Sequence, residues 1–205
     1  MNPAIWPALR DLARDEACTP FMVFLAGFWA LAHRDHGQPG VRVATQIAGR
    51  NAPHLDKVIG LFSDSLALVG EFKKNASFRH ALRLAHRCMM QALAHGAAPY
   101  PLVLDRLGLP AVGESVPLTP VILQFRNFPA PALHGPLAMA EALADHSLGR
   151  FDLSLYLWRE DEALLAEAAY ALDAYSDARI ERLLADYDAL LLAALAAPDA
   201  PLLSL

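Results

Sequence analysis

The stretch from Pro20 to Ala32 contains no charged side chain and is apolar on nearly every side of a helix. It is shorter than the roughly 20 residues that a membrane-spanning helix needs, so we interpret it as a buried helix. Thr19 is placed to cap its first turn, and Pro20 suits the first helical position, where a missing N–H costs nothing. A helix of this kind predicts a central position, with other elements packed around it.

Length and composition limit the alternatives. The chain has 205 residues, of which 55% are hydrophobic and 19% charged, enough for one core and short for two. We therefore predict a single lobe over residues 1–205. The net charge of −5 argues against a nucleic-acid binder. The mean hydropathy of +0.27 indicates either a core rich in alanine and leucine or an apolar surface that another protein covers.

Two further features bear on location. Cys18 and Cys88 lie far apart and suit a reducing compartment, where thiols stay free. Met1 is not followed by a basic segment and an apolar segment, as a secretion signal would require. The expectation is a cytoplasmic protein that does not enter a membrane.

The periodicity of apolar residues predicts an alternation of helices and strands. In residues 137–145 and 163–170 helix competes with strand, because Ala and Glu are poor strand formers. The order of the elements predicts an α/β fold, a two-layer sandwich with a mixed sheet flanked by helices. The predicted helices cover 3–17, 20–33, 77–96, 99–107 (one short turn) and 177–191, and the predicted strands cover 41–47, 66–72, 118–126, 137–145, 151–158 and 163–170.

Two neighbouring motifs carry a family resemblance. Residues 46–50 read QIAGR and residues 59–69 read IGLFSDSLALV. They resemble the "xxAGR" and "IGFFVNTLxLR" region of condensation domains of nonribosomal peptide synthetases. Further stretches are similar to motifs of the same family and occur in the family's order, so that the resemblance extends nearly end to end. They are Thr19–Val23 with Phe28, Ser77–Arg79, His95–Pro101, Pro117–Asn127, Phe151–Leu155 and Asp177–Leu191.

The resemblance implies a fold and a reaction. The family has two lobes, each like chloramphenicol acetyltransferase, with a tunnel between them. The first lobe carries His-His-x-x-x-Asp-Gly, a string that does not occur in this sequence. The chain therefore resembles the C-terminal lobe, with no catalytic residue of its own. In this family the amine of one carrier-bound aminoacyl group attacks the thioester of another, which forms an amide bond and releases the thiol of a phosphopantetheine arm. That cofactor belongs to the carrier proteins, so we expect none to be bound by this chain.

The resemblance also implies site residues and partners. Ser63, Asp64 and Ser65 replace the family's "VNT" and would line the tunnel for substrate or pantetheine. The alternative is a polar strand start held by local hydrogen bonds. The expected partners are the N-terminal lobe, peptidyl and aminoacyl carrier proteins, and adjacent synthetase domains. A latch that crosses to the other lobe would lie within residues 128–149.

Several charged residues are candidates for structural or docking roles. Asp152 lies between apolar neighbours and needs a partner, for which Arg50 is the candidate; we predict a structural salt bridge. The set Arg79, Arg83 and Arg87 recurs every four residues on one helix face. This set is either a solvated face or a docking patch for an acidic carrier protein.

The histidines give little sign of a metal site. His33 and His36 have a spacing that can hold zinc, but no third ligand is visible, so we predict a helix end and no metal. His95 lies in a family motif, where we predict that it helps to close a helix.

Three functions remain open at this level. The first is the C-terminal lobe of a condensation domain, which forms half of the tunnel. The second is a non-catalytic, condensation-like interface domain that docks a carrier protein or a tailoring enzyme. The third is a stand-alone acyltransferase, which would need an active histidine on this chain.

Overall fold

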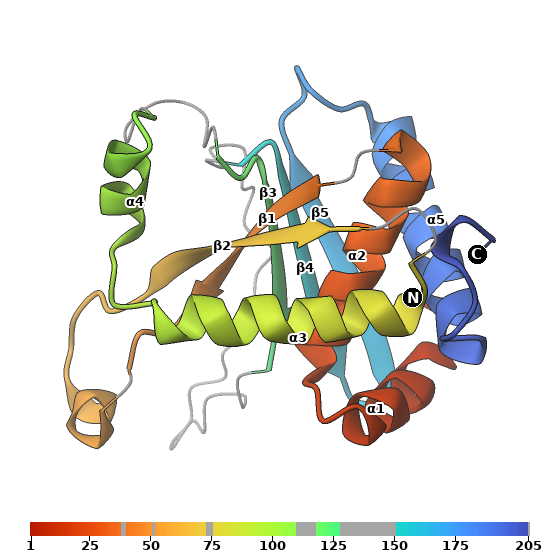
Figure 1. Cartoon of the computed structure of the whole chain (residues 1–205), viewed down its shortest axis with the longest axis horizontal. Coiled ribbons are helices and arrows are strands. Elements are labelled where there is room, and N and C mark those ends of the chain that lie inside the picture. Colours follow the sequence, from red (N-terminus) through yellow and green to blue (C-terminus); the bar gives the residue numbers. More distant parts are fainter. Residues whose placement is uncertain (38–39, 51, 73–75, 110–117, 128–150, 205) are drawn as a thin grey trace, which may run out of the picture.

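The computed structural model describes residues 1–37, 40–50, 52–72, 76–109, 118–127 and 151–204, and the predicted segments 137–145 and 128–149 lie outside them. Helices pack against one mixed sheet, and the two ends of the chain lie on the same side of the molecule (Figure 1). The helices are α1 (Ile5–Asp15), α2 (Pro20–His36), α3 (Phe78–Ala94), α4 (Tyr100–Arg106) and α5 (Asp177–Ala196), with short 3₁₀ turns η1 (Pro53–Lys57) and η2 (Leu202–Ser204). The strands are β1 (Gly40–Ile47), β2 (Asp64–Glu71), β3 (Val121–Arg126), β4 (Leu153–Glu160) and β5 (Ala163–Tyr170).

The sheet has the order β2-β1-β3-β4-β5. Its two outer pairs, β1 with β2 and β4 with β5, are antiparallel and in full register. The inner pairs are parallel: β3 is paired with β4 along its whole length, but β1 meets β3 only at Ala44 and Ile122. The predicted mixed sheet is confirmed, and its weakest seam lies between β1 and β3.

The helix α2 lies at the centre, as its sequence predicts. Its residues Val23, Phe24 and Trp29 are fully buried, and it contacts β1, β3, α3 and α5. Gly27 lets α5 approach closely, because a Cβ there would stand 2.5 Å from a methyl group of Leu191. The Tyr187 hydroxyl of α5 donates a 2.8 Å hydrogen bond to the carbonyl of Phe24.

The predicted helix starts are largely confirmed. The Thr19 hydroxyl accepts from the Met22 N–H, and the Ser77 hydroxyl accepts from the His80 N–H, each at 3.3 Å. Ser176 occupies the cap position of α5, but its hydroxyl makes no capping hydrogen bond. The helix α5 runs beyond its predicted end at residue 191 and stops at Ala196. Alanine and leucine, which favour helix, continue up to that residue, and Pro198 follows shortly after it.

Three elements depart in detail from what their sequences predict or leave open. Residues 163–170 form a strand, since a turn with Asp161 at positive φ folds them back along β4. β3 starts at Val121, later than predicted, and follows Pro120, which has no N–H to donate to the sheet. In α3 the fully buried residues lie in the first half of the helix, and Leu93 near its end is 44% exposed.

Within the described ranges, no helix combines the length and the hydropathy that crossing a bilayer demands. The apolar helix α2 instead owes its composition to its central place in the core.

Candidate functional site

The two motifs that carry the family resemblance come together at one end of β1 and β2. Gln46 is opposite Ser65 in the antiparallel pair, and Ile47 is opposite Asp64. Gly49 follows with φ of 64°, and a Cβ there would stand 1.8 Å from the carbonyl oxygen of Phe62. Only glycine lets the backbone of these two segments pass so closely.

Arg50 organises the loop between the two strands. Its guanidinium donates to the carbonyl of Leu55 and, at 2.9 Å, to that of Val58. It also lies 4.5 Å from the centre of the Phe62 ring, a favourable cation–π position. The predicted salt bridge between Arg50 and Asp152 is therefore wrong, because loop carbonyls and an aromatic ring hold the arginine.

Asp152 acts through its backbone. Its N–H donates to the carbonyl of Pro120 at 2.8 Å, and its own carbonyl accepts from the N–H of Ala171 at 3.0 Å. These bonds tie the residue before β4 to the start of β3 and the end of β5. Any residue at this position could make these backbone bonds, so a structural role for the Asp152 carboxylate stays a prediction.

The three residues in place of "VNT" differ in exposure. Ser63 is exposed, whereas Asp64 and Ser65 are half-buried at the start of β2. The Asp64 carboxylate accepts from the Ser65 N–H at 2.7 Å and from the Tyr100 N–H at 3.5 Å. Part of the aspartate's hydrogen-bonding capacity is thus used locally, to fix β2 against the start of α4.

Tyr100 and Thr119 join this site, although sequence reasoning did not select either residue. The Tyr100 hydroxyl lies 2.7 Å from the hydroxyl of Thr119, which is fully buried. Burial raises the pKa of Tyr100, which keeps the phenol neutral. Each residue belongs to a stretch that resembles a family motif, and that membership was the available signal.

The loop before β2 presents apolar side chains to solvent. Ile59 is fully exposed, Leu61 is 91% exposed, and Val58 is also exposed. Where exposed apolar side chains form a contiguous patch, they mark an interaction site in many soluble proteins. This exposed loop lies in sequence directly before Ser63 and Asp64.

One face of the sheet carries Phe125 and the buried leucines of β4. The opposite face carries polar and aromatic side chains near this loop. The amide of Gln124 donates to the side-chain carbonyl of Gln46 at 2.7 Å. At the end of the same strand, the Arg126 guanidinium lies 4.5 Å from the ring centre of Tyr156 and 5.6 Å from that of Trp158, both on β4. Groups of this kind suit contact with amides and other polar ligands.

The arginines of α3 are not equivalent. Arg79 pairs with Glu16 and, at 2.7 Å, with Asp199, and Arg83 lies 3.0 Å from the other oxygen of Glu16. Hydrogen bonding to Arg79 holds the pKa of Glu16 below its ordinary value. These pairs connect α3 with the end of α1 and with the C-terminal segment. Arg87 is exposed and has no ion pair among the described residues.

Among the described residues, no three side chains that can bind a metal ion lie together. His33 is buried, with its ring 5.3 Å from that of Phe72. His95 is exposed at the C-cap of α3, where its backbone N–H donates to the carbonyl of Gln91. A role of its side chain in closing the helix stays a prediction.

Comparison with curated proteins finds synthetases. The chain is 31% identical over 198 residues to phosphinothricin tripeptide synthetase PhsB of Streptomyces viridochromogenes, covering 94% of this chain and 17% of that protein. It is 28% identical over 187 residues to malpinin synthetase of Mortierella alpina, covering 91% of this chain and 2% of the relative. The chain thus spans a small fraction of the relatives it matches.

Solved structures show the same fold. The condensation domain from the monacolin K polyketide synthase MokA superposes with a TM-score of 0.84 at 20% identity, covering 98% of this chain and 47% of that one. The X-domain from teicoplanin biosynthesis has a TM-score of 0.83 at 16% identity, with the same coverage of both chains. The chain thus spans about half of each of these structures.

The family model for the condensation domain matches residues 2–205. This match includes the Ala-Gly-Arg sequence at residues 48–50, the start of β2 and the strands of the sheet described above. The chain belongs to the condensation domain family of nonribosomal peptide synthetases.

Proposed function

We propose that the chain is the C-terminal lobe of a condensation domain and forms half of a tunnel for amide formation between carrier-bound thioesters. The observation that carries this proposal is the exposed apolar loop at Val58, Ile59 and Leu61, which lies directly before the polar start of β2. Apolar side chains at such exposure favour a protein partner that covers them. The coverage of about half of each solved structure supports the same interpretation.

In this proposal the catalytic histidines come from the partner lobe, in keeping with the absence of His-His-x-x-x-Asp-Gly from this sequence. The present chain contributes a wall to the tunnel. Gln46, Gln124 and the start of β2 offer amide and hydroxyl groups that can hydrogen-bond the amides of a pantetheine arm. The arms belong to the carrier proteins, and this chain binds no cofactor of its own.

The test is an amide-forming assay with a donor-loaded and an acceptor-loaded carrier protein. The chain is assayed alone and together with a cognate half-domain that carries His-His-x-x-x-Asp-Gly, and the condensed product is measured by mass spectrometry. The proposal expects product only when both halves are present. Product from the chain alone would instead support the stand-alone acyltransferase.

Ser63 offers a narrower test of the tunnel. Its side chain is exposed and makes no hydrogen bond in the described structure, so Ser63→Ala removes a hydroxyl without disturbing a structural contact. With both halves present, amide formation should fall several-fold, as expected for the loss of one hydrogen bond to substrate. The melting temperature should stay unchanged. Equal rates for the variant and the unmodified chain would remove Ser63 from the tunnel.

The second candidate is a non-catalytic interface domain. The observation that favours it is the local use of Asp64, whose carboxylate is engaged by the N–H groups of Ser65 and Tyr100. A solved structure of this fold, with a TM-score of 0.78, is a complex of the X-domain and OxyB from teicoplanin biosynthesis. Binding of carriers without product formation, even with both halves present, would support this candidate.

A further inference from the structure

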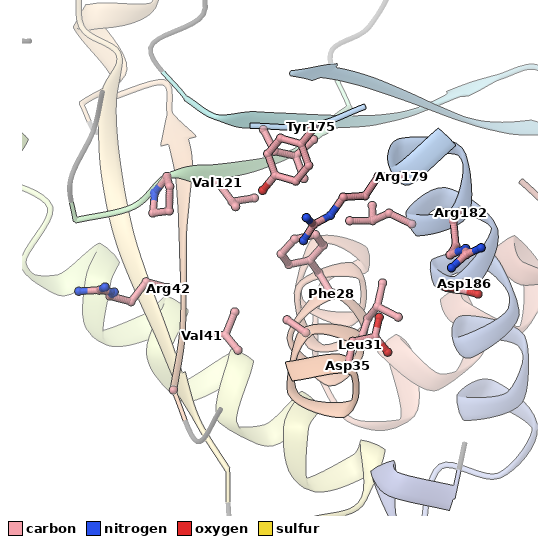
Figure 2. A pocket seen from close by; sticks show the side chains of 15 residues that line it. Phe28, Leu31, Asp35, Val41, Arg42, Val121, Tyr175, Arg179, Arg182 and Asp186 are labelled. Atoms are coloured by element: carbon pink, nitrogen blue, oxygen red, sulfur yellow. The ribbon is translucent and has the colours of Figure 1, made fainter. Parts of the chain in front are cut away.

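A hollow of about 580 Å³ lies between α2, α5 and the first residues of β1, β3 and β4 (Figure 2). It is lined by residues of both β1 and β3, the two neighbouring strands that are paired only at Ala44 and Ile122. Its volume is within the range of pockets that hold small organic ligands.

The hollow is distinct from the loop between β1 and β2, which carries the family motifs. It is lined by Gly40 and Val41 at the start of β1, whereas Asp64 is paired with Ile47 at the end of that strand. At roughly 3.3 Å per residue these two ends of β1 are about 23 Å apart. A ligand in the hollow would therefore not lie at the proposed tunnel wall.

The walls of the hollow are mostly apolar. Phe28 and Leu31 come from α2, Leu183 from α5, and Val41, Val121 and Leu153 from three strands. Such walls favour an apolar ligand body, because they remove hydrocarbon surface from water.

One cation points into this apolar space. Figure 2 shows the Arg179 guanidinium directed into the hollow near Phe28, whereas that of Arg42 is directed away from it. Arg179 lies 5.4 Å from the ring centre of Tyr175, a contact that helps to hold its position. It has no carboxylate within ion-pair distance in the part of the chain that the structure describes.

No acidic group around the hollow forms an ion pair with Arg179 among the described residues, although the Asp152 carboxylate lies near enough to the Tyr175 hydroxyl to act on it electrostatically. Asp35 is already paired with Arg34 at 3.0 Å. Asp186 lies beside Arg182, one helical turn away on α5, as Figure 2 shows. The inward-facing guanidinium of Arg179 therefore remains available to an anion, and the Tyr175 hydroxyl is directed into the same space.

We propose that this hollow binds an amphiphilic carboxylate, with Arg179 and Tyr175 on the carboxylate and the apolar walls around the hydrocarbon body. A single guanidinium and a hydroxyl match one negative charge, and guanidinium binds carboxylate in a two-pronged geometry. Burial raises the pKa of Tyr175, so its hydroxyl remains a neutral donor near neutral pH.

The test is calorimetric titration of the whole chain with decanoate below its micellar concentration. Arg179→Gln should weaken binding at least about tenfold, in line with the loss of a charged hydrogen bond. The control Arg10→Gln changes an exposed arginine of α1 outside the hollow and should leave the affinity unchanged. Decylamine, which has the same chain and the opposite charge, should not bind.

A second variant tests the apolar part. Ala32→Trp places a large ring in the hollow and should abolish decanoate binding, and a melting curve will show that the variant is folded. The proposal is overturned if decanoate fails to bind the unmodified chain. It is also overturned if decylamine binds as tightly as decanoate, or if a folded Arg179→Gln or Ala32→Trp variant binds decanoate with unchanged affinity.

Discussion

Gly49 shows how a single residue fixes the geometry of the loop between β1 and β2. It has positive φ, and the carbonyl oxygen of Phe62 occupies the place of a side chain. Gly49→Ala should lower the free energy of unfolding by about 2–4 kcal/mol, because backbone strain and a steric clash add together. Gly37 has a similar φ of 61° and open space around it, so Gly37→Ala should cost only about 1 kcal/mol. Equal losses in urea unfolding would show that the close approach to Phe62 is unimportant.

The ionisation of Glu16 makes the stability of the fold depend on pH in the acid range. Its pKa is lowered, chiefly by the hydrogen bond from Arg79, so the folded state favours its charged form. The resulting stability is present above about pH 4.3, the ordinary pKa of a glutamate, and is lost as the pH falls through the lower folded pKa. Glu16→Gln should be less stable than the unmodified chain at pH 7, and the difference should shrink as the pH falls below about 4. Melting temperatures measured across this range check the sign, and a constant difference would contradict it.

At the scale of an element, α3 divides into a structural end and an exposed end. Arg79 and Arg83 are engaged by Glu16 near its start, whereas Arg87 has no described ion pair. If this face docks an acidic carrier protein, Arg87→Glu should weaken carrier binding several-fold at low salt, and added salt should reduce the difference. The melting temperature should stay the same, unlike that of Arg83→Glu, which also loses a pair to Glu16. Unchanged carrier binding by Arg87→Glu would leave α3 as a solvated face.

The features of the fold that depend on residues close together in the sequence could be predicted from the sequence. The predicted cap at Thr19 bonds to a residue three positions away, and the buried character of α2 follows from its own composition. The sequence of residues 163–170 is compatible with both helix and strand, because alanine and glutamate are poor strand formers. Pairing with β4 makes them a strand, and that is a tertiary effect.

Contacts between distant residues could not be predicted in the same way. Arg50 satisfies its charge with nearby carbonyls and the Phe62 ring, and nothing in its sequence position distinguishes these partners from Asp152. The contact of Tyr100 with Thr119 joins residues 19 positions apart across a loop. The family motifs pointed to the start of β2 as the candidate site, but they did not indicate the local use of the Asp64 carboxylate.

At the scale of the whole molecule, the exposed loop before β2 should be an interface. The double variant Ile59→Ser with Leu61→Ser replaces two strongly exposed side chains and should leave the stability of the chain unchanged within about 0.5 kcal/mol. Its affinity for the half-domain that carries His-His-x-x-x-Asp-Gly should fall at least about tenfold, because buried apolar anchors dominate such interfaces. The matched control is the double variant Leu102→Ser with Leu107→Ser, which changes two exposed leucines in and next to α4. Equal losses for both double variants would argue against a specific interface at the loop.

The most direct measurement is the association of this chain with that cognate half-domain in analytical ultracentrifugation. We predict a one-to-one complex whose formation requires Ile59 and Leu61 and which forms amide product from loaded carriers. Two species that sediment independently at micromolar concentration, while the chain alone still binds a carrier protein, would contradict the role of a condensation lobe and favour an interface domain.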